Sequence, residues 1–111
     1  MDQGIKGQVT DILTAGVALV DEIVLHLQTG REDRGIADFM LLIESLSAVI
    51  AVLQDNKENI VQDFDALDIP GFNRVMQEIA EAWEHMDVVL VADLLEYELK
   101  AKLQTLAEQL G

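Results

Sequence analysis

The amino-acid sequence predicts an all-α fold, an up-and-down bundle of four main helices. In four segments the apolar residues recur at alternating steps of three and four, which places them on one face of an α-helix. The chain contains a single proline, Pro70, so long helical runs are uninterrupted. Half of the residues are hydrophobic but only 5% are aromatic, and a core of Ala, Val, Leu and Ile suits helix packing. With 111 residues, one domain over residues 1–111 is expected.

The first predicted helix spans residues 5–28 and carries two parallel apolar stripes, so it should contact two neighbours. Gly16 lies in its middle and costs about 1 kcal/mol of helix propensity relative to Ala. Close approach of another helix is the expected reason for that glycine. Gly30 is expected to end the helix. The two stripes are Ile5, Val9, Ile12, Gly16, Leu19, Ile23 and His26, and beside them Leu13, Val17, Val20, Val24 and Leu27.

The second predicted helix, residues 36–54, contains the most apolar stretch of the chain, FMLLIESLSAVIAVL at 39–53. A membrane span needs about 20 apolar residues, and this stretch is shorter, so we interpret it as the central helix of a bundle. Its inward stripe is expected to comprise Ile36, Phe39, Ile43, Leu46, Ile50 and Leu53, with Leu42, Val49 and Val52 widening the apolar face. The opposite face is small or polar and almost uncharged.

The third predicted helix covers residues 72–85 and is clearly amphipathic, with Met86 continuing its inward face. The preceding connection, 55–70, leaves room for a short extra helix at about 58–67. A turn at Asp68, Ile69, Pro70 and Gly71 is then expected.

The fourth predicted helix covers residues 88–110, with Asp87 as its N-cap. The run Val88–Val91 could locally form a strand, but a stripe of leucines continues to the end of the chain and favours a helix. Glu96 with Lys100, and Glu98 with Lys102, have the spacing of supporting ion pairs.

The charge of the chain excludes several kinds of partner. With 21 acidic against 7 basic residues the formal net charge is −14, which repels nucleic-acid phosphates and anionic lipid headgroups. We therefore expect no nucleic-acid and no membrane binding, whereas a basic protein surface remains permitted, as does mimicry of a nucleic acid. The ordinary role of such a charge is to keep an apolar-rich bundle soluble.

The absence of cysteine removes disulfides, thiolate nucleophiles and thiolate metal sites together. A cytoplasmic location is consistent with it, and the opening residues MDQGIKGQ lack the basic and apolar regions of a signal peptide.

Two pairs of side chains have a spacing that could hold a metal ion, Glu22 with His26 and Glu81 with His85. Carboxylate-bridged di-iron bundles place glutamate and histidine three residues apart, whereas both pairs here are four apart. No metal and no cofactor is therefore expected. A metal-binding helical bundle, as an enzyme or a metal carrier, is the alternative function.

Motifs for catalysis are missing from the rest of the chain. The segment GREDRG at 30–35 lacks the lysine and hydroxyl residue of a phosphate loop, and Ser45 and Ser47 have no neighbouring histidine. Counted from Asp63, the acidic residues of the 63–68 segment do not follow the EF-hand pattern. No catalytic residue and no enzymatic activity is expected.

The expected function is non-enzymatic protein–protein interaction, as an adaptor, a regulator or an export-type chaperone. The nearly uncharged face of the second helix is the candidate surface, and a homodimer is its simplest use. Tyr97 could cover the edge of the core or contact a second chain. The interaction candidates are Glu44, Ser47, Ala48, Ala51 and Tyr97.

The segment DVVLVADLLEYEL at 87–99, with the preceding EIAEAWEHM, resembles a C-terminal pattern of small, all-helical, uncharacterised bacterial proteins, some of them associated with motility genes. Its distinctive members are Asp93, Glu96, Tyr97 and Glu98. A proline often follows in that pattern, whereas this chain continues as Lys-Ala-Lys. The resemblance implies a helical fold and no catalytic residue.

Overall fold

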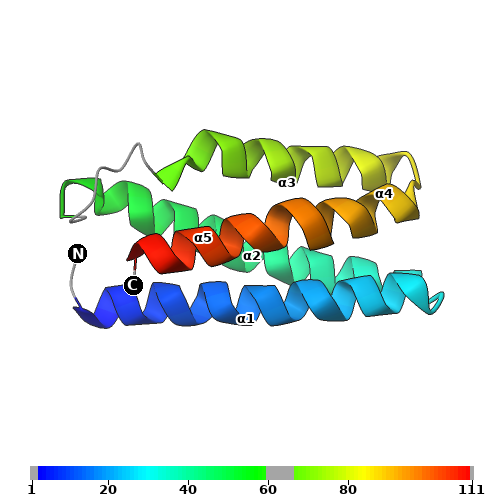
Figure 1. The fold of residues 1–111 in the computed structure, drawn as a ribbon, viewed down its shortest axis with the longest axis horizontal. Coiled ribbons are helices and arrows are strands. Elements are labelled where there is room, and N and C mark those ends of the chain that lie inside the picture. The colour runs from blue at the N-terminus through cyan, green and yellow to red at the C-terminus, as the bar shows by residue number, and fades with distance from the viewer. Residues whose placement is uncertain (1–2, 60–66, 111) are drawn as a thin grey trace.

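The computed structural model describes residues 3–59 and 67–110 and shows the predicted all-α bundle (Figure 1). Successive helices run in opposite directions, and α1 begins and α5 ends at the same end of an elongated body measuring 43 × 22 × 19 Å. The main helices are α1 (Gln3–Gln28), α2 (Glu32–Asp55), α3 (Ile69–Glu84) and a last helix made of α4 (Val88–Asp93), η3 (Leu94–Leu99) and α5 (Lys100–Leu110). A short 3-10 turn, η1 (Lys57–Asn59), follows α2.

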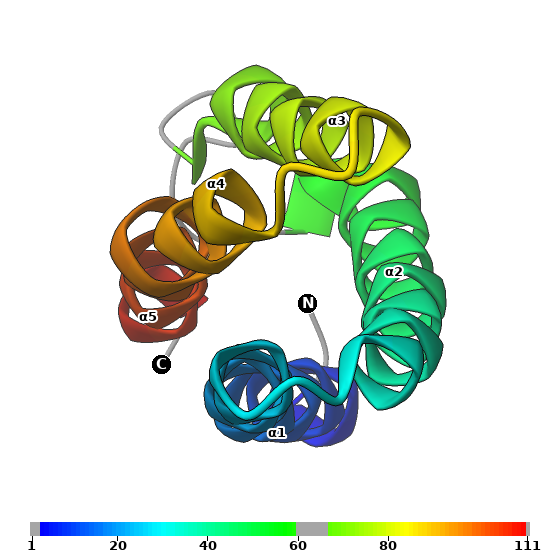
Figure 2. The same cartoon turned by 90° about the vertical axis from the view of Figure 1, so that its right-hand side faces the viewer.

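Seen end on, the helices form a ring in which α1 lies between α2 and the last helix, and α3 closes the opposite side (Figure 2). The core is apolar throughout, and none of its described buried side chains is polar or charged. Leucines are its most frequent members, and 12 of its side chains are less than 2% exposed. The largest fully buried ones are Leu13, Ile23, Leu42, Leu46, Leu53, Ile79, Leu95, Leu99 and Leu103.

The inward face of α1 combines members of both predicted stripes. Val9, Leu13, Gly16, Val20 and Ile23 are buried, whereas Ile12 is 37% exposed and Leu19 half-buried. Gly16 faces Leu42 and Leu103, but a methyl group there would meet their side chains at 3.5 Å, an ordinary van der Waals contact. Close approach of a helix therefore does not require this glycine.

The corner between α1 and α2 is a Schellman motif. Gly30 has a φ of 77°, and the amides of Gly30 and Arg31 donate to the carbonyls of Leu27 and His26. The helix end predicted at Gly30 is confirmed. The predicted start of the second helix at Ile36 is four residues late, because Glu32 and Asp33 already form the first turn of α2, where carboxylates favour the positive end of the helix dipole.

The buried stripe of α2 lies within the predicted apolar face, but its centre is displaced toward the Leu42 and Val49 flank. Phe39, Leu42, Leu46, Val49 and Leu53 are its large buried side chains. The predicted core position Ile36 is 43% exposed, so that assignment was wrong. Ile43 and Ile50 are half-buried and pack against the core from its edge. The Leu42 side of α2 faces α1, because a β-carbon at Gly16 would lie 3.5 Å from Leu42 and 3.9 Å from Leu46.

By length and composition α2 could also cross a membrane, since it has 24 residues rather than the 15 of its most apolar stretch. The length argument against a membrane span therefore does not apply to the whole helix. The core helix of a soluble protein passes the same test, but such a helix is mostly buried. In α2 only 28% of the apolar window is buried inside the bundle. The helix thus presents an unusually apolar outer face.

The helix α3 begins at Ile69, three residues before its predicted start. The carboxylate of Asp68 accepts a hydrogen bond from the amide of Gly71, and Pro70 stands in the first turn, where its missing N–H is harmless. The expected turn is thus the start of α3. The predicted extra helix at 58–67 falls mostly on residues 60–66, which lie outside the described part of the chain. Met86, expected inward, is 67% exposed.

The last helix contains the π-helical turn η3 in its middle. Buried residues Val91, Leu95, Leu99 and Leu103 follow one another in steps of four. On an ideal α-helix, which has 3.6 residues per turn, each step of four rotates the side-chain direction by about 40° around the helix axis. Three such steps would rotate it by about 120°. The wider π turn reduces this drift and keeps the leucines directed inward. The N-cap at Asp87 is confirmed, since its carboxylate accepts from the amide of Leu90 at 3.1 Å.

The two lysines of the last helix pair with other helices rather than with their predicted glutamates. Nζ of Lys100 lies 2.9 Å from Oδ1 of Asp21 on α1, and Nζ of Lys102 lies 3.5 Å from Oδ2 of Asp68. The predicted partners Glu96 and Glu98 form no ion pair among the described residues. The lysines point at neighbouring elements because each stands beside the buried leucine stripe.

Candidate functional site

A groove of about 400 Å³ lies between α2 and α3. These helices are neighbours in the ring of Figure 2, but they approach each other less closely than α1 and α2 do. The α2 wall is Ile43, Leu46, Ser47, Ile50, Ala51 and Gln54, and the α3 wall is Phe72, Asn73, Met76, Gln77 and Ala80.

Every residue that lines this groove is uncharged, although a quarter of the chain is charged. The sequence accounts for this in α2, which has no charged residue between Glu44 and Asp55. In α3 the lining comes from the flank between the buried stripe and the glutamate-rich outer face. Leu46 and Phe72 are buried, while Ser47, Ala51 and Ala80 are exposed, so the floor is apolar and the upper walls are open to solvent.

An aromatic contact joins α2 and α3 beyond one end of the groove. The rings of Phe39 and Trp83 have centroids 5.9 Å apart and planes inclined at 43°. Such tilted pairs contribute about 0.5–1.5 kcal/mol beyond the burial of their area. The contact joins the two helices near the α3–α4 turn, and the groove lies further along both helices, toward their other ends.

The structure divides the predicted interaction face of α2. Glu44, Ser47, Ala48 and Ala51 are all exposed, as a contact surface requires. Ser47 and Ala51 line the groove, but Ala48 lines a smaller hollow of about 220 Å³ on the α1 side, and Glu44 lines neither. The α3 wall was missed, because sequence periodicity assigned Met76 to the core and Gln77 to solvent.

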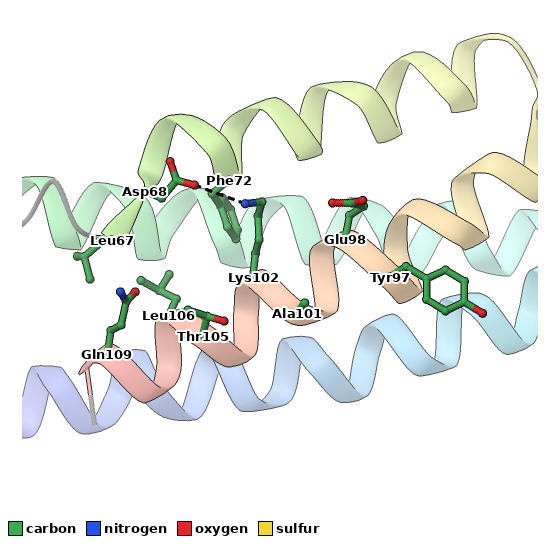
Figure 3. Close-up of a pocket in the computed structure, with 10 residues that line it drawn as sticks. All are labelled: Leu67, Asp68, Phe72, Tyr97, Glu98, Ala101, Lys102, Thr105, Leu106 and Gln109. Atoms are coloured by element: carbon green, nitrogen blue, oxygen red, sulfur yellow. Dashed lines mark hydrogen bonds and ion pairs between the residues drawn. The ribbon is translucent and has the colours of Figure 1, made fainter.

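Tyr97 lines a second hollow, of about 300 Å³, between the start of α3 and the last helix (Figure 3). It is 69% exposed, and its ring points away from the Asp68–Lys102 pair at the centre of the view. Asp68 caps α3 and also accepts from Lys102, so the charged groups are engaged within the bundle. These contacts hold the start of α3 against the last helix, and the hollow that contains them is a weaker candidate than the groove.

The two histidines do not pair with the predicted glutamate side chains. Nε2 of His26 lies 3.3 Å from Oδ2 of Asp38, which joins α1 to α2. Nδ1 of His85 lies 2.8 Å from the backbone carbonyl of Glu81, not from its carboxylate. Over the described residues, no three His, Asp or Glu side chains converge as metal ligands.

The fold and the groove define the class as a small, acidic, up-and-down helical bundle with an apolar groove along one pair of helices. A family model described as "Domain of unknown function (DUF8042)" matches residues 9–109. The chain therefore belongs to the DUF8042 family. No curated protein and no solved structure matches the chain.

Proposed function

We propose that this chain is a non-enzymatic protein-interaction module, of the adaptor, regulator or export-chaperone type, and that it binds its partner through the groove between α2 and α3. One observation carries the proposal: an apolar, uncharged groove in a chain of net charge −14. Exposed apolar surface in a soluble protein is unfavourable unless a partner covers it, and grooves between two helices are a recurring site for such partners.

A protein partner fits this groove better than a small molecule does. Sites for small molecules bury most of their ligand and place a few polar groups around it. Here much of the wall is exposed, and Ser47, Gln54, Asn73 and Gln77 are its polar members. None of them carries a charge that could fix a small polar ligand in one orientation.

In-cell cross-linking tests the proposal. A photoreactive amino acid placed at Ala51, in the groove, should give a protein adduct in the native host. The same residue at Ala48, also exposed but on the α1 side, should give much less of it. Equal adducts from both positions, or a lipid adduct at Ala51, would contradict the proposed surface.

The expected cytoplasmic location and absence of membrane binding belong to the same proposal, supported by the acidic charge and the lack of cysteine.

Self-association is also part of the proposal, at a different surface. Seven exposed large apolar side chains lie in the α3–α4 turn or in the helix halves that adjoin the α1–α2 and α3–α4 turns, and these two turns lie at the same end of the bundle (Figure 1). Arg31 and Arg34 stand there among acidic residues, so two copies can meet at that end with both signs of charge present. The seven are Leu25, Ile36, Met40, Leu41, Met86, Val89 and Leu90.

Light scattering at micromolar concentration should give about twice the chain mass, as expected for a closed two-fold dimer. Met40 is 60% exposed, so Met40→Arg should leave the fold intact and return the mass to one chain. Ala48→Arg adds the same charge at an exposed position of α2 outside this end and should leave the dimer unchanged. A single-chain mass at every concentration reached would rule out the dimer.

A further inference from the structure

We infer that the groove binds one amphipathic helix of about three turns, supplied by a partner protein, with an apolar stripe flanked by basic residues. This inference rests on the proposed function and names the chemistry of the partner. It is drawn from the length of the groove, the chemistry of its walls and the charges along its rims.

The length of the groove sets the length of the occupant. Its α2 wall runs from Ile43 to Gln54 and its α3 wall from Phe72 to Ala80. At 1.5 Å per residue these walls measure about 16 Å and about 12 Å. A helix of about three turns covers that distance, and residues at i, i+3, i+4 and i+7 would place its apolar stripe on the floor.

The walls favour a helix over an extended segment. An extended peptide brings unpaired backbone N–H and C=O groups, which lose their water when they enter an apolar groove. Both walls are helices, whose own backbone groups are already bonded along the helix, so they offer no strand edge to pair with. A helical occupant satisfies its own backbone and leaves only side chains to contact the floor.

The rims of the groove are acidic. On α2, Glu44 lies three residues before Ser47 and Asp55 four residues after Ala51, so both stand beside lining residues on the helix surface. On α3, Glu81 and Glu84 stand in the same relation to Gln77 and Ala80. These four carboxylates form no ion pair among the described residues.

Within α2 and α3, the positive charge at the same spacing is one guanidinium, that of Arg74, three residues before Gln77. Four carboxylates and one guanidinium leave three net negative charges around an uncharged floor. Basic flanks on the occupant complement this pattern, which raises the association rate and orients the helix. A second copy of the chain would bring its own −14 charge against the rims and is disfavoured in the groove.

Three fluorescent peptides of about 14 residues test the inference by anisotropy titration. The first has a leucine stripe with lysine flanks, the second has the same stripe with glutamate flanks, and the third has the first composition in an order that breaks the stripe. The lysine-flanked peptide should bind at least about tenfold more tightly than the other two, and its affinity should fall as salt rises from about 50 to about 300 mM, because exposed charges are screened.

Two variants locate the binding site on the protein. Ala51→Arg places a long charged side chain in the groove and should weaken binding of the lysine-flanked peptide at least about tenfold. Ala48→Arg makes the same change of charge three residues away, outside the groove, and should change the affinity less than about threefold. Both positions are exposed, and circular dichroism melts should confirm that both variants fold.

Each other result overturns a defined part of the inference. If the lysine- and glutamate-flanked peptides bind equally well, the occupant does not need basic flanks. If the peptide without a stripe binds as well as the lysine-flanked one, the occupant is not an amphipathic helix. If the two arginine variants lose affinity equally, the groove is not the peptide-binding site. If the dimer mass falls to one chain in Ala51→Arg, the groove binds a second copy of the chain instead. If no peptide binds but Ala51 still cross-links to a protein in cells, the inference fails while the proposed function stands; failure of both experiments rejects both.

Discussion

The amide of Gly71 donates a hydrogen bond of 3.2 Å to Oδ1 of Asp68, and a β-carbon at residue 71 would overlap the same carboxylate. The cap of α3 therefore requires both residues, the acid for its oxygen and the glycine for its missing side chain. Oδ2 of Asp68 also forms an ion pair with Nζ of Lys102 at 3.5 Å, so the capping residue links the start of α3 to the last helix.

We expect Asp68→Ala and Gly71→Ala each to lower the free energy of unfolding by about 1 kcal/mol, the usual effect of losing an N-cap. Urea denaturation measures it. In the double variant the losses should not add, because a methyl group at residue 71 has no carboxylate to displace once Asp68 is gone. Gly7→Ala is the control: apart from the adjoining backbone of α1, nothing lies within 4 Å of its added carbon, so it should stabilise α1. Stabilisation by Gly71→Ala would refute this view of the cap.

Gly16→Ala should raise the free energy of unfolding by about 1 kcal/mol, because alanine has the higher helix propensity. The added carbon would meet Leu42 and Leu103 at 3.5 Å, which is an ordinary contact. Gly35→Ala should gain less, since its added carbon would lie 2.9 Å from Cδ2 of Leu27, and that side chain must move. Denaturant midpoints of the two variants provide the comparison, and a loss of stability at residue 16 would show that the helices cannot accept the methyl group.

Met86 occupies the left-handed position of a Schellman motif, with a φ of 56°, and the amides of Met86 and Asp87 donate to the carbonyls of Trp83 and Ala82. Left-handed backbone costs an L-residue about 1–2 kcal/mol, so Met86→Gly should stabilise the protein by about 0.5–1 kcal/mol. Gly30→Ala, at the equivalent position after α1, should have the opposite sign. Thermal unfolding of both variants tests the pair, and equal signs would contradict the backbone explanation.

Leu42→Ala should destabilise the bundle by about 2–5 kcal/mol, as truncation of a fully buried side chain usually does. Ile50→Ala should cost clearly less, because Ile50 is half-buried at the wall of the groove. Chemical denaturation of the two variants decides between the observed core and the stripe predicted from sequence, in which Ile43 and Ile50 were central. Equal losses of unfolding free energy in the two variants would favour the stripe predicted from sequence over the observed core.

Much of the fold could be predicted from the sequence because helix periodicity and helix ends are local properties. The all-α bundle is confirmed, as are the helix end at Gly30 and the N-cap at Asp87. The starts of α2 and α3 were placed too late, because the charged segment before Ile36 and the proline at residue 70 were interpreted as connections. Both instead supply residues that suit the first turn of a helix.

The candidate site could be predicted only in part. Ser47 and Ala51 were identified as an uncharged face, and they line the groove. The opposing residues Asn73, Gln77 and Ala80 carry no signal of their own, because nothing in the pattern of α3 indicates how closely it approaches α2. Sequence spacing likewise gave local partners for Lys100 and Lys102, whereas each lysine reaches an aspartate on another element.

The sequence by itself determined which residues are helical and which side chains share a face, since both follow from 3.6 residues per turn and from the end residues of each helix. The tertiary structure decided which flank of each face became core. On α2 that choice buried Leu42, at the edge of the predicted stripe, more deeply than Ile43, and on α1 it mixed the two stripes. It also left α2 and α3 with a groove between them, because helix separation depends on how side chains of different helices fit together, and no single helix encodes that fit.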